Sequence, residues 1–166
     1  MSPSPLALAL TGASGSGKTT LIAALIGIFT ARGLTVSTLK HAHHKLAFDT
    51  PGKDSFRHAE AGAHEVILAS DQGFALFSRT AAPLEALLAR LAPADLVLVE
   101  GFKSYPLPRL EVFRPALGKP PLWPQIPVLA VAADAPLPSC TVPVLDLNQP
   151  TLIADFLTAA LRLKRG

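Results

Sequence analysis

Cysteine is almost absent from this 166-residue sequence, in which Cys140 is the single thiol. One thiol excludes an internal disulfide, and without a C-x-x-C pair it cannot form a zinc site by itself. The sequence therefore fits a reducing compartment.

The sequence also lacks a late apolar run long enough to cross a bilayer. The longest uncharged apolar stretch after the first strand-like run, residues 19–31, is shorter than the roughly 20 residues that a spanning helix needs. Residues 6–10 are apolar, but no Lys or Arg precedes them as in a secretory signal. We therefore expect a cytoplasmic protein without a membrane partner.

Charged residues are scarce, at 16% against 49% hydrophobic residues. This balance excludes a wholly disordered chain and favours a single domain over residues 1–166. The net charge of +3 favours anionic partners. The only dense basic group is Arg162, Lys164 and Arg165, which we interpret as a solvated tail, so no nucleic-acid partner is expected.

Short apolar runs alternate along the chain with helical patterns. The runs that predict strands are residues 6–11, 36–39, 66–69, 74–77, 96–99, 110–113, 128–132 and 142–145. Helical patterns cover residues 18–32, 54–61, 84–91 and 152–163, and Gly33 is expected to cap the first helix. The alternation predicts an α/β fold: a three-layer sandwich like that of P-loop NTPases, with a mainly parallel, partly mixed sheet.

Proline is concentrated in residues 106–127, which contain seven of the 16 prolines. Proline disrupts both helices and central strands, so we expect a long arm here, interrupted by an edge strand at 110–113. A domain linker is the alternative, but the about 40 residues that follow are too few for an independent domain.

A phosphate-binding motif occupies residues 12–19, which match G-x-x-x-x-G-K-[ST] between a predicted strand and a predicted helix. Glycines allow backbone N–H groups to turn toward phosphate oxygens, at the positive end of the following helix. Lys18 is expected to neutralise the β and γ phosphates, and the Thr19 hydroxyl to bind Mg²⁺. A glycine-rich turn with a surface lysine is the alternative interpretation.

Glu100 is the candidate acidic partner of this loop, because it ends the apolar run 96–99 and precedes Gly101. A carboxylate there can hold Mg²⁺ through water or orient an attacking water, and Gly101 lets the chain turn near the phosphates. A glutamate that merely ends a strand in solvent is the alternative.

Five histidines could suggest a metal site, but they lack an accompanying cysteine or a helical i, i+4 frame. They are His41, His43, His44, His58 and His64. Phosphate or substrate contact and solvated loop positions remain open. Residues 49–52 match the D-x-x-G of GTPase switch regions, but the segment before them does not have the pattern of a buried strand.

Several motifs together resemble those of one family. Residues 40–44, 49–58 and 61–63, with the phosphate loop and residues 99–103, resemble the molybdopterin-guanine dinucleotide biosynthesis adapter (MobB) family over nearly the whole chain. The resemblance implies a GTP-binding homodimer that assists a MobA-type guanylyltransferase, the enzyme that joins GMP from GTP to molybdopterin. It also implies at most weak GTP hydrolysis.

The resemblance implies site residues as well. The phosphate ligands would be Gly12, Ala13, Ser14, Gly15, Ser16, Gly17, Lys18, Thr19 and Thr20. Thr19 and Glu100 would neighbour Mg²⁺, with Lys18 and Glu100 serving any hydrolysis, and Gly101 would lie beside them. The segment 41–55 would form a loop near nucleotide or cofactor, with His41, Asp49, Lys53 and Asp54 as contacts.

Two departures from the pattern affect this interpretation. Lys45 stands where relatives often have an acidic residue, and the N-K-x-D sequence by which many GTPases recognise guanine is missing. Asp134 and Asn148 are the candidates for base contact, because they follow the last predicted strands. Guanine preference is thus an implication of the resemblance.

Two other functions share the phosphate loop. A small-molecule kinase usually carries an arginine-bearing lid, and Arg79, Arg109 and Arg114 form no evident one in the sequence. A metal-delivery GTPase would rest on the five histidines. Because no catalytic glutamine or arginine finger can be named, hydrolysis is expected to be slow.

Overall fold

The structure, a computed structural model, describes residues 5–42 and 50–164. The chain divides into two compact units, which are described separately. The larger unit comprises residues 1–41 and 88–166, and the hairpin unit comprises residues 42–87. The boundary falls within the helix α3 (Leu84–Arg90).

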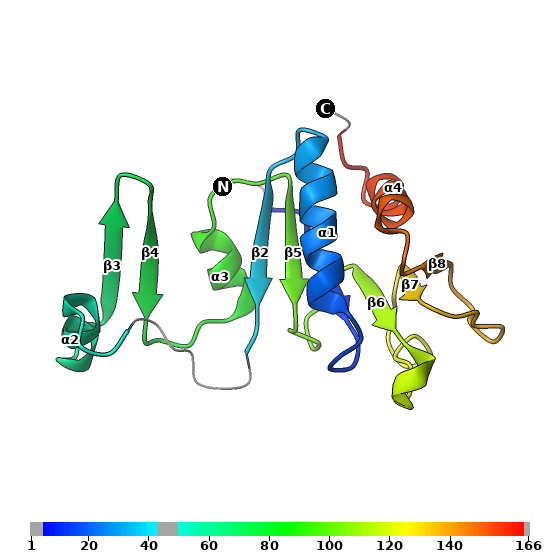
Figure 1. Cartoon of the computed structure of the whole chain (residues 1–166), viewed down its shortest axis with the longest axis horizontal. Coiled ribbons are helices and arrows are strands. Elements are labelled where there is room, and N and C mark those ends of the chain that lie inside the picture. Colours follow the sequence, from blue (N-terminus) through cyan, green and yellow to red (C-terminus); the bar gives the residue numbers. More distant parts are fainter. Residues whose placement is uncertain (1–4, 43–49, 165–166) are drawn as a thin grey trace. The chain divides into compact units, whose positions relative to one another are not determined.

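The larger unit is built on a six-stranded sheet in the order β2-β5-β1-β6-β7-β8 (Figure 1). Every neighbouring pair in this sheet is parallel. The strands are β1 (Ala7–Thr11), β2 (Val36–Lys40), β5 (Leu96–Glu100), β6 (Arg109–Phe113), β7 (Ala130–Ala133) and β8 (Val144–Asp146). Because all six run the same way, their carboxyl ends lie along one edge, where ligands bind in open α/β sheets.

Two packed helices cover one face of this sheet: α1 (Lys18–Ala31) and α4 (Pro150–Ala160) (Figure 1). In α1 the buried residues Leu21, Leu25 and Phe29 recur every four positions, so they form one stripe facing the sheet. They join leucines of β1 and β5 in a single apolar core. Gly33, with φ of 81°, follows the last turn of α1 and ends it as expected.

The opposite face of the sheet is buried as well, and the proline-rich segment supplies part of its cover. Successive side chains of a strand point to opposite faces, so Glu111 lies on the face away from the core residues Leu110 and Val112. Its carboxylate accepts hydrogen bonds from the backbone N–H groups of Leu122 and Trp123. The segment after β6, which includes the 3₁₀ helix η1 (Pro115–Leu117), is therefore anchored to that face.

The expected edge strand at 110–113 is wrong in its position, because β6 lies between β1 and β7. The prolines that suggested an edge flank the strand and do not interrupt its hydrogen bonds. Four of its five residues are buried. The proline density predicted an irregular segment correctly on either side of β6.

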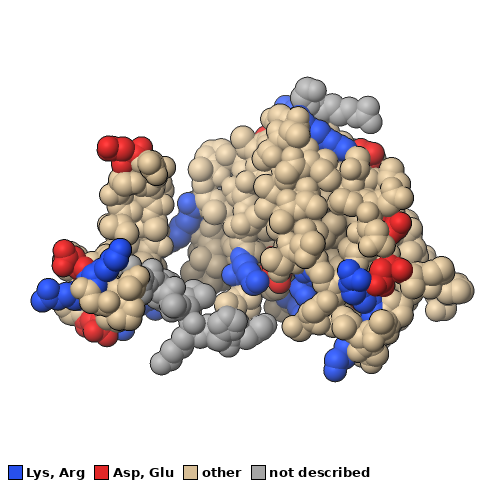
Figure 2. Space-filling view, in the orientation of Figure 1, with Lys and Arg blue, Asp and Glu red and all other residues tan. Residues whose placement is uncertain are grey.

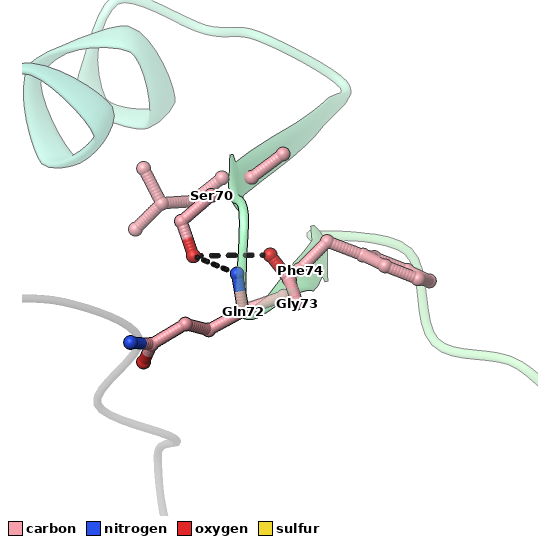
Figure 3. A pocket seen from close by; sticks show the side chains of 7 residues that line it. Ser70, Gln72, Gly73 and Phe74 are labelled. Atoms are coloured by element: carbon pink, nitrogen blue, oxygen red, sulfur yellow. Dashed lines mark hydrogen bonds between the residues drawn. The ribbon is translucent and has the colours of Figure 1, made fainter.

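The hairpin unit contains α2 (Asp54–Glu60) and the antiparallel strands β3 (Glu65–Ser70) and β4 (Gly73–Ser78). The Ser70 Oγ accepts a hydrogen bond of 3.2 Å from the Gln72 N–H at the turn (Figure 3). The apolar side chains are exposed: Ile67 by 65%, Leu68 by 55% and Phe74 by 76%. A two-stranded hairpin has little area in which to bury them.

The α/β fold with a mainly parallel sheet is confirmed. Antiparallel pairing is confined to the separate hairpin β3–β4. Within residues 5–42 and 50–164, no helix is long and apolar enough to cross a membrane.

Candidate functional site

The loop between β1 and α1 has a backbone that glycine makes possible. Gly12, Gly15 and Gly17 have φ values of 139°, 78° and 101°, which side-chain-bearing residues rarely adopt. A Cβ on Gly12 would lie 2.2 Å from the carbonyl oxygen of Val112, so the loop is packed directly against β6. Glycine is thus favoured at these positions by the backbone conformation, and at Gly12 also by the close packing against β6.

The helix α1 opens on this loop with Gly17 as its N-cap and without a side-chain cap. No acidic residue lies in its first turn, so its N–H groups and its positive end can face an anion. The Ser16 Oγ is buried in the loop and has no hydrogen-bond partner among the residues that the structure describes. This orphaned polar atom fits a loop built to contact a polar ligand.

Lys18 lies folded over the loop. Its Nζ donates to the carbonyl oxygens of Ala13 at 2.8 Å and Gly12 at 3.2 Å. Partial burial lowers the pKa of Lys18 from its ordinary value, the Glu100 carboxylate raises it, and the positive charges of Lys103 and Lys40 lower it further. An ammonium group is therefore held at the loop beside a carboxylate.

Glu100 meets the first turn of α1, as the sequence predicts. The Thr19 hydroxyl donates to its Oε2 at 3.4 Å, and the side chain of Glu100 is only 16% exposed. A hydroxyl and a carboxylate oxygen are hard donors of the kind that Mg²⁺ prefers, so this pair fits the ion. No group of three or more His, Cys, Asp or Glu side chains that could hold a metal occurs among the residues that the structure describes.

The chain turns sharply after Glu100. Gly101 has φ of 98°, and a Cβ there would lie 2.7 Å from the Cβ of His41. The His41 N–H donates to the Glu100 carbonyl oxygen at 2.9 Å, and its ring lies 4.8 Å from that of Phe102, centroid to centroid. Gly101 and His41 are therefore both adjacent to Glu100.

Asp134 lies on the other side of the phosphate loop, immediately after β7. Its Oδ2 accepts a hydrogen bond of 2.5 Å from Arg114 Nη1, and Arg114 Nε donates to the Ser16 carbonyl oxygen at 3.0 Å. Arg114 thus links the candidate base-contacting residue to the phosphate loop. Asn148, after β8, is held by Asp146, whose Oδ1 accepts from its backbone and side-chain amides.

The remaining predicted site residues lie in different parts of the chain. Ser14, Gly15, Thr19 and Thr20 are exposed on the loop and the first turn of α1. Lys53 and Asp54 begin α2 in the hairpin unit. Asp49 lies outside the described residues, as do His43, His44 and Lys45.

Sequence reasoning missed Lys40 and gave Arg114 no role at the loop. Lys40 ends β2, and its Nζ lies 3.5 Å from Glu100 Oε2. Arg114 directly follows β6. Both stand at carboxyl ends of parallel strands, which is the signal that could have identified them.

Charged side chains lie along this edge of the larger unit. Figure 2 shows Lys and Arg gathered, with acidic side chains between them, along the lower edge of the larger unit, where the strands of Figure 1 end. By contrast, the hollow at the hairpin turn is lined by Leu68, Ala69, Ser70, Gln72, Gly73, Phe74 and Ala75 (Figure 3). None of these is charged, so that hollow offers no charged side chain to a ligand.

Comparisons with known proteins agree with these motifs. The family model described as "Molybdopterin guanine dinucleotide synthesis protein B" matches residues 7–134. The chain is 45% identical to a molybdopterin-guanine dinucleotide biosynthesis adapter protein of Haemophilus influenzae, over 90% of this chain and 86% of that protein. It is 39% identical to the adapter protein of Escherichia coli, over 96% and 95% of the two chains.

Solved structures are similar as well. The MobB protein homolog from Bacillus stearothermophilus is 26% identical, with a TM-score of 0.69, over 95% of this chain and 99% of that one. A structure of "molybdopterin-guanine biosynthesis protein B (mobB)" is 28% identical, with a TM-score of 0.73 and the same coverage. A phosphate loop with its acidic partner, in a chain that these relatives match along most of their length, makes this protein a member of the MobB family.

Proposed function

We propose that this protein is a GTP-binding adapter in molybdopterin guanine dinucleotide biosynthesis that assists a MobA-type guanylyltransferase. The observation that carries the proposal is the phosphate loop with Thr19 3.4 Å from Glu100, in a chain whose relatives are named as adapters of that biosynthesis. The assisted reaction joins a guanine nucleotide to molybdopterin, so guanosine triphosphate is the ligand that such an adapter would bring.

The loop residues have separate tasks in this proposal. The backbone N–H groups of residues 12–20 bind phosphate oxygens, and Lys18 exchanges the Ala13 and Gly12 carbonyls for the β and γ phosphates. Thr19 and Glu100 hold Mg²⁺, which would neutralise charge on the phosphates when bound. His41 and Gly101 set the position of the Glu100 backbone.

The base is expected to lie toward β7 and β8. Those strands are on the opposite side of β1 from Glu100, so a nucleotide with phosphates at the loop can extend its base toward Asp134. A carboxylate is the acceptor that matches the N–H groups of guanine. Asn148 is the second candidate, one strand further along the sheet.

Hydrolysis is expected to be weak. Among the described residues, the arginine beside the loop is already held, because Arg114 pairs with Asp134 and the Ser16 carbonyl. An arginine aimed at the transition state can be worth about 10³–10⁵ in rate. Arg109 is buried and bonded to the Tyr105 carbonyl, which also makes it a poor lid for a kinase.

The proposal includes a homodimer in the cytoplasm. The exposed apolar side chains of β3 and β4 provide a surface suited to a second copy of this chain, because a hairpin can pair with itself about a two-fold axis. Lys53, Asp54 and the segment around Asp49 would then serve nucleotide, pterin or partner contacts.

The experiment measures dinucleotide formation by a MobA-type guanylyltransferase with molybdopterin, GTP and Mg²⁺, with and without this protein. We expect stimulation by the wild-type chain and none by Lys18→Ala, and GTP-dependent association of the two proteins. Absence of both association and stimulation would contradict the adapter function. Rapid phosphorylation of a small metabolite, with release of ADP, would instead indicate a kinase.

A further inference from the structure

Lys40 is a cation beside the carboxylate that the proposed function assigns to Mg²⁺. It ends β2, and its Cα is the register partner of Glu100 on β5. The Nζ lies 3.5 Å from Glu100 Oε2, the same oxygen that accepts the Thr19 hydroxyl. The side chain of Lys40 is 60% exposed, whereas that of Glu100 is 16% exposed. A solvent-exposed cation therefore reaches a carboxylate that is mostly buried.

This ion pair has little value for folding. Exposed lysine–carboxylate pairs are screened by water and salt, and many contribute nothing measurable to stability. A structural role therefore does not explain why a lysine stands at the ligand-binding edge of the sheet.

Among the residues that the structure describes, several positive charges lie around Glu100. The charges of Glu100, Lys103 and Lys40 all act electrostatically on Lys18, and the Nζ of Lys40 lies 3.5 Å from Glu100 Oε2. The excess of positive charge favours a polyanion at this side of the phosphate loop. A nucleoside triphosphate carries negative charge of this kind on its terminal phosphate.

The order of strands in the six-stranded sheet indicates which part of a bound nucleotide would lie near Lys40. The loop follows β1, and Asp134 follows β7, two strands away on one side. Glu100 and Lys40 end β5 and β2, the first and second strands on the other side. A nucleotide with its base toward Asp134 therefore directs its terminal phosphate toward Glu100 and Lys40.

We propose that Lys40 recognises the terminal phosphate of a nucleoside triphosphate and so discriminates GTP from GDP. This inference rests on the proposed function. Without a γ-phosphate, Lys40 and Mg²⁺ compete for Glu100 Oε2. With a γ-phosphate, Lys40 has a second anion to bind, and the carboxylate is released for the metal. Binding of Mg²⁺ and of the γ-phosphate is thereby coupled at one side chain.

The test is calorimetric titration of GTP and GDP into wild type, Lys40→Gln and Lys40→Arg, with Mg²⁺ and with EDTA. The matched control is Lys164→Gln, which also removes one lysine charge. Lys164 lies near Asp95, and Asp95 precedes β5, so this lysine is at the opposite edge of the sheet from Glu100. We expect Lys40→Gln to weaken GTP about tenfold in Mg²⁺ while changing GDP less than about threefold. Lys40→Arg should restore most of the preference, and Lys164→Gln should match wild type.

Each other outcome has a distinct meaning. Equal weakening of GTP and GDP by Lys40→Gln would overturn the inference, because the lysine would then act only through general attraction of anions. Tighter binding of both nucleotides in Mg²⁺ would also overturn it, since Lys40 would be only a competitor of the metal. If the wild-type chain binds no GTP, the proposed function itself fails, and the inference fails with it.

Discussion

The larger unit and the hairpin unit use the same kind of strand for opposite purposes. In β5, the residues Leu96, Val97, Leu98 and Val99 are all fully buried between neighbouring strands and packed layers. In β3, Ile67 and Leu68 are more than half exposed, because a two-stranded hairpin has little packed surface over its faces. Apolar composition is thus a property of the strand, whereas burial is a property of its surroundings.

This difference separates two functions in the proposed account. The larger unit buries its apolar residues to hold a strained loop and a charged edge in place, which suits nucleotide binding. The hairpin unit presents its apolar residues outward, which suits association. Substitutions should therefore affect either the nucleotide or the assembly, according to the unit in which they fall.

The largest effect is expected for Gly12→Ala in the larger unit. The new Cβ would lie 2.2 Å from the Val112 carbonyl oxygen, at a residue with φ of 139°. The free energy of unfolding should fall by about 3 kcal/mol or more, with loss of GTP binding. Denaturant unfolding followed by circular dichroism measures the change.

Gly15→Ala is the matched control, since Gly15 also has a positive φ, of 78°, but nothing lies within 4 Å of the added Cβ. It should cost only about 1–2 kcal/mol. Equal losses in the two variants would contradict the close packing of the loop against β6.

The next effect concerns the anchor of the proline-rich segment. Glu111→Ala removes the acceptor for the N–H groups of Leu122 and Trp123. Both donors are only partly buried, so each costs about 1–2 kcal/mol without a partner, and the free energy of unfolding should fall by about 2–4 kcal/mol. Hydrogen exchange should show faster exchange at those two amides, with little change in β3. Unchanged exchange at both amides would contradict the anchoring role.

A smaller effect is expected from the hairpin. Phe74→Ser removes an apolar side chain that is 76% exposed. If that surface pairs with a second copy, the dimer dissociation constant should rise about 10- to 100-fold while GTP affinity stays unchanged. Analytical ultracentrifugation measures the dimer dissociation constant. Leu152→Ser, at a 56% exposed position on α4, is the control and should leave the dimer intact. An equally stable dimer in Phe74→Ser would contradict this interface.

The smallest effect is a dependence of stability on pH. Burial raises the pKa of Glu111 above its ordinary value of 4.5, although its backbone hydrogen bonds act in the other direction. The folded state then binds more protons than the unfolded state between the two pKa values, so this contribution to stability is full below about pH 4.5 and is lost as the pH rises through the raised pKa. The free energy of unfolding of wild type should therefore fall relative to Glu111→Gln over that window. The opposite trend would contradict a raised pKa.

Much of the fold was predictable because its signals are local. Apolar runs fixed the strands, and the motif at residues 12–19 fixed the turn from β1 into α1. The position of a strand within the sheet has no such local signal. The prolines around β6 suggested an edge strand, but β6 lies between β1 and β7. Proline excludes a backbone donor only at its own position, so flanking prolines carry no information about strand neighbours.

The candidate site was predictable to a similar degree. The pairing of Thr19 with Glu100 followed from the chemistry of the motif and the end of an apolar strand. Lys40 and Arg114 were missed because their roles depend on which strands are adjacent. Strand order joins residues that are far apart in sequence, and no local pattern encodes it.

The most direct test of the account is the affinity of the purified protein for GTP in the presence of Mg²⁺, measured by calorimetry on wild type and Lys18→Ala. The account predicts binding by wild type and its loss in Lys18→Ala, with unchanged circular dichroism, because Lys18 is the first residue of α1, beside the loop, and is not part of the core. Undiminished GTP affinity in a folded Lys18→Ala protein would contradict the central claim.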